Sequence, residues 1–119
     1  MNTFNRVVMI AISFIVVSCG GGGGGGGGSD YQQPAPPANN APMITNSSTN
    51  YSVVENQTSA FTVTASDSDG DTLTYTISGN DSEDFSITSG GVVTFTVAPD
   101  YENPADADTN NVYEITANV

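Results

Sequence analysis

The chain has 119 residues, of which 13 are Asp or Glu and one is Lys or Arg, and it has one Cys and no His or Trp. A chain of this length accommodates at most one small domain. The single base, Arg6, lies near the N-terminus, so no later residue can neutralise phosphate, and we expect no binding to nucleic acid or to anionic lipid headgroups. The composition also lacks the reagents for Ser-His and Cys-His nucleophiles, lysine Schiff bases and histidine-bound zinc, so we expect no enzyme. An acidic surface of this kind suits a metal cation.

Residues 1–18 are predicted to be a secretory signal, because Arg6 precedes an uninterrupted apolar or small run over residues 7–17. As a helix this run would be about 18 Å long, short of the ~30 Å hydrocarbon core, so we expect no permanent transmembrane helix. Residues 16–19, Val-Val-Ser-Cys, resemble a bacterial lipobox. The resemblance implies cleavage before Cys19, lipidation of its thiol, and attachment to the bacterial cell envelope through the lipid alone, at the outer membrane or cell surface. The alternative is an ordinary secreted protein with a free cysteine.

Residues 19–41 are predicted to be a flexible tether. Nine consecutive glycines, Gly20 to Gly28, are followed by a stretch rich in Pro, Asn and Gln. A glycine run behaves as a flexible coil and a proline-rich stretch as a stiffer extended segment, and neither can bury a core. A phosphate-binding loop would need a preceding strand and a following helix, which are not predicted here.

Residues 42–119 are predicted to form a β-sandwich, because apolar residues alternate with Thr and Ser at a period of two. Turn signals rich in Gly, Asp and Asn separate the alternating segments, and no apolar residues recur at helical spacing. The expected strands, in chain order, are 43–44, 51–54, 61–65, 73–77, 85–87, 93–97 and 113–119. Short strands at this spacing are typical of an antiparallel sandwich.

The motifs of this block resemble the cadherin-type repeat in its bacterial form, in the order Val53-Val54-Glu55-Asn56, 65–71 with 73–77, 85–87, 90–92, 100–102 and 113–116. The resemblance covers nearly all of residues 42–119 and implies an all-β, antiparallel Greek-key sandwich of the cadherin and immunoglobulin kind. Repeats of this family continue to a seventh strand and an Asp- and Asn-rich linker. We therefore expect this repeat to be incomplete at its C-terminal side and to lack its last strand.

Calcium is the cofactor that the resemblance implies. It assigns Glu55, Asp100 and Glu102 to the pole facing a following repeat, and Asp67 and Asp69 to the opposite pole. Asp67 with Asp69, and Asp100 with Glu102, are also spaced so that an extended backbone projects both carboxylates to one side, as calcium with its six to eight oxygen ligands requires.

The alternative for the Asp67 segment is a solvated Asp-Gly turn between two strands. An EF-hand is excluded, because Thr72 and Ser78 stand where that loop needs Gly and Glu. Asp71, Asp106 and Asp108 are expected to be turn or surface residues.

The favoured function is a calcium-binding adhesion or spacer module of a lipid-anchored surface protein, with adjacent repeats and other surface proteins or polysaccharide as partners, and adhesion between like copies as one form of it. This step is an analogy from fold. The alternative is an accessory carbohydrate-binding domain of a larger envelope enzyme, with Tyr51, Tyr101 and Tyr113 as the candidate aromatics. A glycosidase with paired carboxylates is not expected, because so small a sandwich leaves little room for the cleft.

Overall fold

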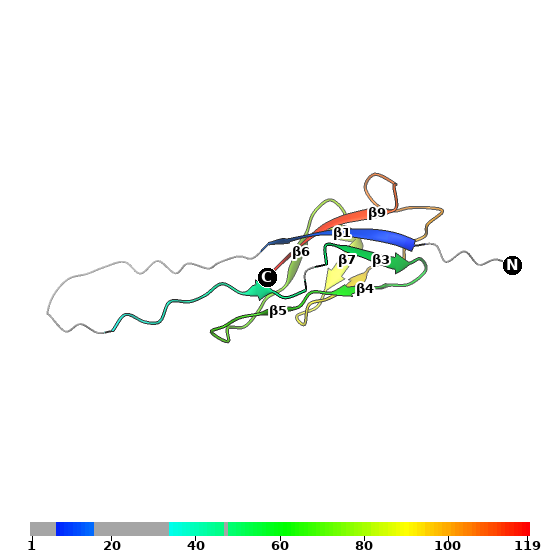
Figure 1. Ribbon diagram of the computed structural model, residues 1–119. Coiled ribbons are helices and arrows are strands. Elements are labelled where there is room, and N and C mark those ends of the chain that lie inside the picture. The colour runs from blue at the N-terminus through cyan, green and yellow to red at the C-terminus, as the bar shows by residue number, and fades with distance from the viewer. Residues whose placement is uncertain (1–6, 16–33, 47) are drawn as a thin grey trace.

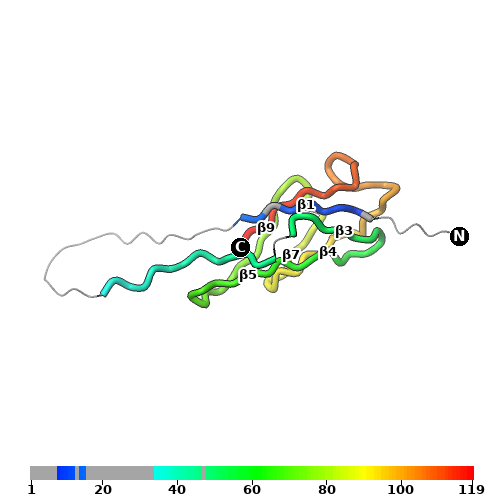
Figure 2. Tube along the Cα trace, viewed as in Figure 1, coloured from blue at the N-terminus to red at the C-terminus, as the bar shows by residue number. Residues whose placement is uncertain are grey.

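The computed structural model describes residues 7–15, 34–46 and 48–119, and the ordered elements of these residues are strands apart from one short 3-10 turn (Figures 1 and 2). The strands are β1 (Val7–Ile15), β2 (Met43–Ile44), β3 (Asn50–Val54), β4 (Ser59–Thr62), β5 (Ala65–Ser66), β6 (Thr76–Ser78), β7 (Phe85–Ile87), β8 (Val92–Phe95) and β9 (Val112–Asn118), and the turn is η1 (Ser82–Asp84). No helix in this described part is long and apolar enough to cross a membrane. The prediction of an all-β fold is confirmed.

The strands form a four-stranded sheet in the order β3-β1-β9-β6, a three-stranded sheet in the order β4-β8-β7, and a two-stranded sheet of β2 and β5. The inward side chains of the two larger sheets make one apolar core. At its centre Phe85, Phe95 and Tyr113 pack with ring centroids 4.4 to 5.6 Å apart. Tilted and edge-to-face contacts of this kind add to the stabilisation that burial alone provides. The core is therefore built from the alternating apolar rows of the sequence.

Strand β1 is the largest difference from the sequence prediction. The prediction that residues 1–18 are a secretory signal did not include a strand, and in the structure Val7–Ile15 lies in the centre of the four-stranded sheet, antiparallel to β3 and parallel to β9 (Figure 1). Val8, Ile10 and Ile12 are buried in the core. Branched apolar residues suit such a strand, and a short continuous apolar run is compatible with either role. Cleavage before Cys19 stays a prediction, since residues 16–33 lie outside the described part of the chain.

We expected the sandwich to lack its last strand, which would leave one side of β9 without a neighbour. The sheet continues on both sides of β9, with β1 on one side and β6 on the other. In this structure the N-terminal segment therefore occupies a central strand position beside β9.

Three predicted strands differ in extent by more than one residue at an end. Residues 61–65 divide between β4, which pairs with β8, and β5, which pairs with β2, because the chain changes sheets there. Of residues 73–77 only the end is paired: Thr76 lies opposite Asn118, so the residues before it run past the end of β9. Strand β8 ends at Phe95, and Val97 is 78% exposed, so its predicted place in the buried row is wrong.

Candidate functional site

Three carboxylates converge at one end of the sandwich: Glu55, directly after β3, and Asp100 and Glu102, in the segment between β8 and β9. One oxygen from each lies within 4.8 Å of the others. Glu55 is half-buried, whereas Asp100 and Glu102 are exposed. We call these residues the carboxylate triad. The structure thus brings together the three residues that the cadherin-like motifs assigned to one pole.

Backbone hydrogen bonds hold the two segments of the triad together. The Asn56 amide donates to the Pro99 carbonyl at 2.9 Å, and the Tyr101 amide donates to Glu55 Oε2 at 3.0 Å. Asn56 has a φ of 63°, a left-handed conformation that Asn tolerates better than most residues, and it turns the chain sharply after β3. The Glu102 amide donates to Asp100 Oδ1 at 3.0 Å, which orients the second carboxylate. The triad is therefore positioned by the fold.

The geometry of the triad suits a divalent cation with oxygen ligands. Two oxygens bound to one calcium ion at about 2.4 Å can be at most about 4.8 Å apart, and the triad oxygens meet that limit. Backbone carbonyls and water would have to complete the six to eight ligands that calcium takes.

The second predicted pole has a different arrangement. Asp67 Oδ1 accepts hydrogen bonds from the amides of Asp69 and Asp71 at 2.8 and 3.3 Å, which is the pattern of an Asp turn. Asp69 Oδ2 accepts from the backbone amide of Asn40 at 2.6 Å and from its side chain at 3.1 Å. Within the described ranges, the triad is the cluster in which three or more acidic ligand atoms converge, and Asp67 and Asp69 are not part of it. Metal binding by Asp67 and Asp69 stays a prediction.

Two further carboxylates, which the sequence did not single out as important, are buried and structural. Asp81, 4% exposed, accepts from the amides of Ala107 and Glu114 at 2.7 and 2.6 Å. Asp106, expected at a turn or on the surface, is 2% exposed and accepts from the amides of Asn110 and Asn111 at 2.8 and 3.3 Å. Asp81 thus ties the segment between β8 and β9 to β9 itself, and Asp106 closes a turn within that segment. In the sequence both residues lie among turn-forming residues, and no signal there distinguishes them from exposed turn residues.

Asp84, at the end of η1, has a raised pKa. Burial raises its pKa above the ordinary value of 3.8, and the negative charges of Asp81, Asp106 and Glu83 raise it further. Burial also raises the pKa of Tyr113, against a backbone hydrogen bond at Ala105 that lowers it. Repulsion from neighbouring carboxylates therefore contributes to the raised pKa of Asp84.

The aromatic candidates for carbohydrate binding do not form a shared surface. Tyr113 is 1% exposed and belongs to the core row of β9, so its ring is not available to a carbohydrate. Tyr51 stacks on Phe61 with centroids 4.6 Å apart, and its hydroxyl accepts from the Asn46 side chain at 2.9 Å. Tyr101 is 37% exposed. Of the three, Tyr101 is the most exposed residue.

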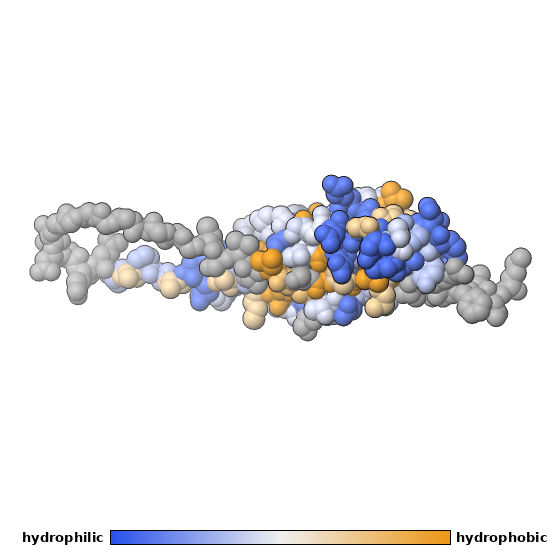
Figure 3. All heavy atoms as spheres, turned by 90° about the horizontal axis from the view of Figure 1, so that it is seen from above, coloured by the Kyte–Doolittle hydropathy of each residue, from blue (hydrophilic) through white to orange (hydrophobic). Residues whose placement is uncertain are grey.

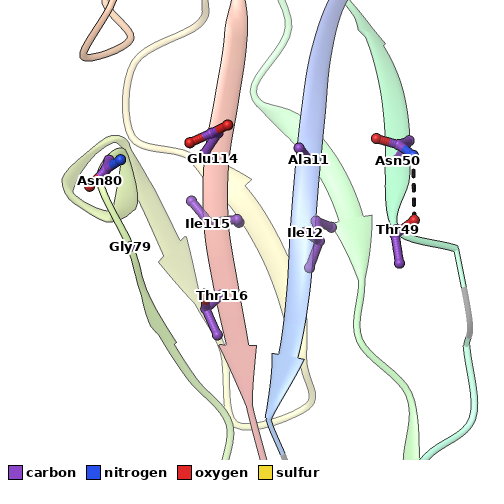
Figure 4. A pocket seen from close by; sticks show the side chains of 9 residues that line it. All are labelled: Ala11, Ile12, Thr49, Asn50, Gly79, Asn80, Glu114, Ile115 and Thr116. Atoms are coloured by element: carbon purple, nitrogen blue, oxygen red, sulfur yellow. Dashed lines mark hydrogen bonds between the residues drawn. The ribbon is translucent and has the colours of Figure 1, made fainter.

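A shallow hollow of about 450 Å³ crosses β3, β1 and β9 and reaches the turn at Gly79 and Asn80 (Figure 4). Its only charged side chain is that of Glu114, and the rest of its lining is apolar, hydroxyl or amide. It offers neither a nucleophile-base pair nor a metal cluster. In Figure 3 hydrophilic residues cover much of the visible face of the domain, with smaller apolar areas among them.

Comparison with known families gives one match: a model described as a bacterial Ig domain covers residues 39–118. Comparison with curated proteins and with solved structures gave no match. The matched range includes the triad and every strand from β2 to β9, and it does not include β1.

Proposed function

Since the chain belongs to the bacterial Ig domain family, we propose that it is a calcium-binding adhesion or spacer module of a lipid-anchored protein at the bacterial cell surface. Domains of this family are typically non-catalytic cell-surface modules. The calcium, the adhesion and the anchor are parts of the proposal. The observation that carries it is the convergence of Glu55, Asp100 and Glu102 within 4.8 Å at one end of the sandwich.

Two features support calcium as the ligand. The triad brings three carboxylates together with one oxygen of each within 4.8 Å of the others, a spacing at which one divalent cation can bind all three. Carboxylate and carbonyl oxygens are also the ligands that calcium prefers. The likeness of residues 53–56 and 100–102 to cadherin-type motifs supports the same assignment. A junction stiffened in this way would let the domain act as a spacer between the membrane and a partner repeat.

Calcium binding is tested by titrating the full chain with calcium in a calorimeter. We expect a dissociation constant of about 10⁻⁴ to 10⁻³ M, the range of extracellular calcium modules. Glu102→Gln should weaken binding by roughly tenfold, because a ligand charge is lost. Glu114→Gln, which removes the same charge from the exposed face of β9 outside the triad, is the matched control. Equal affinities of the two variants, or no heat of binding to the wild type, would contradict the proposal.

A third variant tests whether the predicted second pole, Asp67 and Asp69, binds calcium independently of the triad. If Asp67 and Asp69 also bind calcium, Asp69→Asn should lower the number of ions bound without changing the affinity of the triad. The same stoichiometry in Asp69→Asn and wild type would leave Asp69 with the structural role given by its hydrogen bonds to Asn40.

Lipid anchoring at Cys19 is tested by feeding cells labelled palmitate. Label is expected on the wild-type chain and not on Cys19→Ala, because the thiol carries the lipid. Equal label on both chains would contradict the anchor.

Adhesion between like copies is tested with beads coated with the full chain. They should aggregate in calcium and disperse in chelator, whereas binding to glycans without calcium would favour the carbohydrate-binding alternative.

A further inference from the structure

We propose that the position between β3 and β9 is a strand-binding site for another polypeptide. In the full-length chain Val7–Ile15 fills it. Once residues 1–18 are removed, it accepts an extended segment with an apolar side chain at every second position. The inference rests on the proposed cleavage before Cys19 and does not depend on calcium.

The backbone of β1 is engaged on both sides. Its partners run from Val7 opposite Val54 to Ala11 opposite Asn50 on β3, and from Met9 opposite Val112 to Ile15 opposite Asn118 on β9. Flanking bonds extend the pairing, with the Ile12 amide donating to the Thr49 carbonyl at 2.8 Å. Figure 4 shows the three strands side by side, with β1 in the middle. Without β1, the facing edges of β3 and β9 would present unpaired backbone groups, which recruit strands from other chains.

The side chains of β1 define what the site accepts. Val8 and Ile10 are fully buried and Ile12 is 6% exposed, whereas Met9 and Ile15 on the other face are 42% and 48% exposed. The buried residues contact the core row of β9, which contains Tyr113, Ile115 and Ala117. A segment that fills the site therefore needs apolar residues at alternate positions and tolerates varied residues between them.

Two observations indicate that the site is not reserved for β1. The family match begins at residue 39, so the bacterial Ig domain in this chain is recognised without β1. In addition, β3 is antiparallel and β9 is parallel to β1, so an inserted strand of either direction would have one parallel and one antiparallel neighbour. Backbone pairing is possible for both directions. The site thus selects a strand by its alternating apolar side chains.

Disulfide trapping with a synthetic peptide tests the proposal. The peptide has the sequence of residues 7–15 with Met9→Cys and terminal lysines for solubility. The protein is the full chain with Ser52→Cys, Cys19→Ala and Ile10→Asp, where Ile10→Asp disables its own β1. Met9 and Ser52 are directly opposite in the antiparallel pair of β1 and β3, where Cα atoms lie about 4.5 to 5.5 Å apart, within the range of a disulfide. Because Ile10→Asp could prevent folding, the peptide is present during refolding, and chelator is present throughout so that calcium plays no part.

We expect the peptide to cross-link roughly tenfold more than a matched peptide carrying Ile10→Asp and Ile12→Asp, because that peptide would bury two charges. It should cross-link equally poorly to the protein that keeps Ile10, whose own β1 fills the site. Moving the protein cysteine to Asn50, the partner of Ala11, should also reduce the yield, which establishes the register. Equal labelling by the two peptides, equal labelling with and without Ile10→Asp, or no cross-link after refolding would each overturn the proposal.

Discussion

Asp81 supports a sharp prediction about what holds the segment between β8 and β9 in place. Its carboxylate is 4% exposed, and one oxygen accepts from the Ala107 amide while the other accepts from the Glu114 amide. Asp81→Asn keeps the size of the side chain but replaces one acceptor oxygen with an amide group that faces an N–H donor. A hydrogen bond to a charged group contributes about 1.5 to 3 kcal/mol, and a buried donor left unpaired adds to the loss. We therefore expect the free energy of unfolding to fall by about 2 to 4 kcal/mol, a large share of the ~5 to 15 kcal/mol that holds a domain together.

The assay is equilibrium unfolding in urea followed by tyrosine fluorescence, since the chain has no Trp and Tyr113 lies in the core. Glu83→Gln is the control, because it removes one charge from an exposed position of η1. Amide hydrogen exchange gives a local readout, and the amides of Ala107 and Glu114 should lose more protection in Asp81→Asn than other amides do. If Asp81→Asn and Glu83→Gln unfold at the same urea concentration, the reasoning is refuted.

Three further outcomes are expected. In urea unfolding, Gly91→Ala should destabilise the domain by about 2 kcal/mol or more beyond the loss caused by Gly70→Ala. Both glycines have a φ of 79°, but only at Gly91 would the new Cβ meet the Val63 carbonyl, at 2.2 Å. Equal losses of stability in the two variants would contradict the clash. Asp84→Asn should raise the free energy of unfolding at pH 7 by less than about 1 kcal/mol and leave it unchanged at pH 3. The raised pKa makes the native Asp84 carboxyl bind more protons than the unfolded one just above pH 3.8, so wild-type stability falls as the pH rises through that window. Thermal melts at both pH values check this, and a gain in stability only at pH 3 would contradict it. Ile10→Ala should lower the free energy of unfolding by about 2 to 5 kcal/mol in the same assay, and Met9→Ala by about 0.5 kcal/mol or less, because of the two only Ile10 is fully buried. Similar losses in the two variants would mean that β1 is not in the sheet.

Much of the fold could be predicted because its strands carry a period-two pattern. The expected segments 43–44 and 85–87 are strands with the same bounds, and the core row from Tyr113 to Val119 is buried as expected. The place of β1 could not be predicted, because a continuous apolar run has no period that separates a strand buried in a sheet from a signal segment. Where strands end depends on where their partners end, as at Thr76, and sequence patterns do not report partners.

The site shows a similar division. Glu55 is separated from Asp100 and Glu102 by more than 40 positions in the chain, and no local spacing could bring them together. Ordered motifs similar to those of a repeat family grouped them, and the structure has their carboxylates converging. Asp81 and Asp106 carry no such motif, and their burial depends on the path of the segment between β8 and β9, so the sequence left them indistinguishable from exposed turn residues.

The buried carboxylates of Asp81 and Asp106 are held by neutral backbone amides, and the described residues contain no base that could form an ion pair. Added salt therefore has no ion pair to weaken at these two carboxylates. It does screen the repulsion between the exposed carboxylates, which extends furthest in dilute buffer. The two buried carboxylates are thus fixed by contacts that change little with ionic strength.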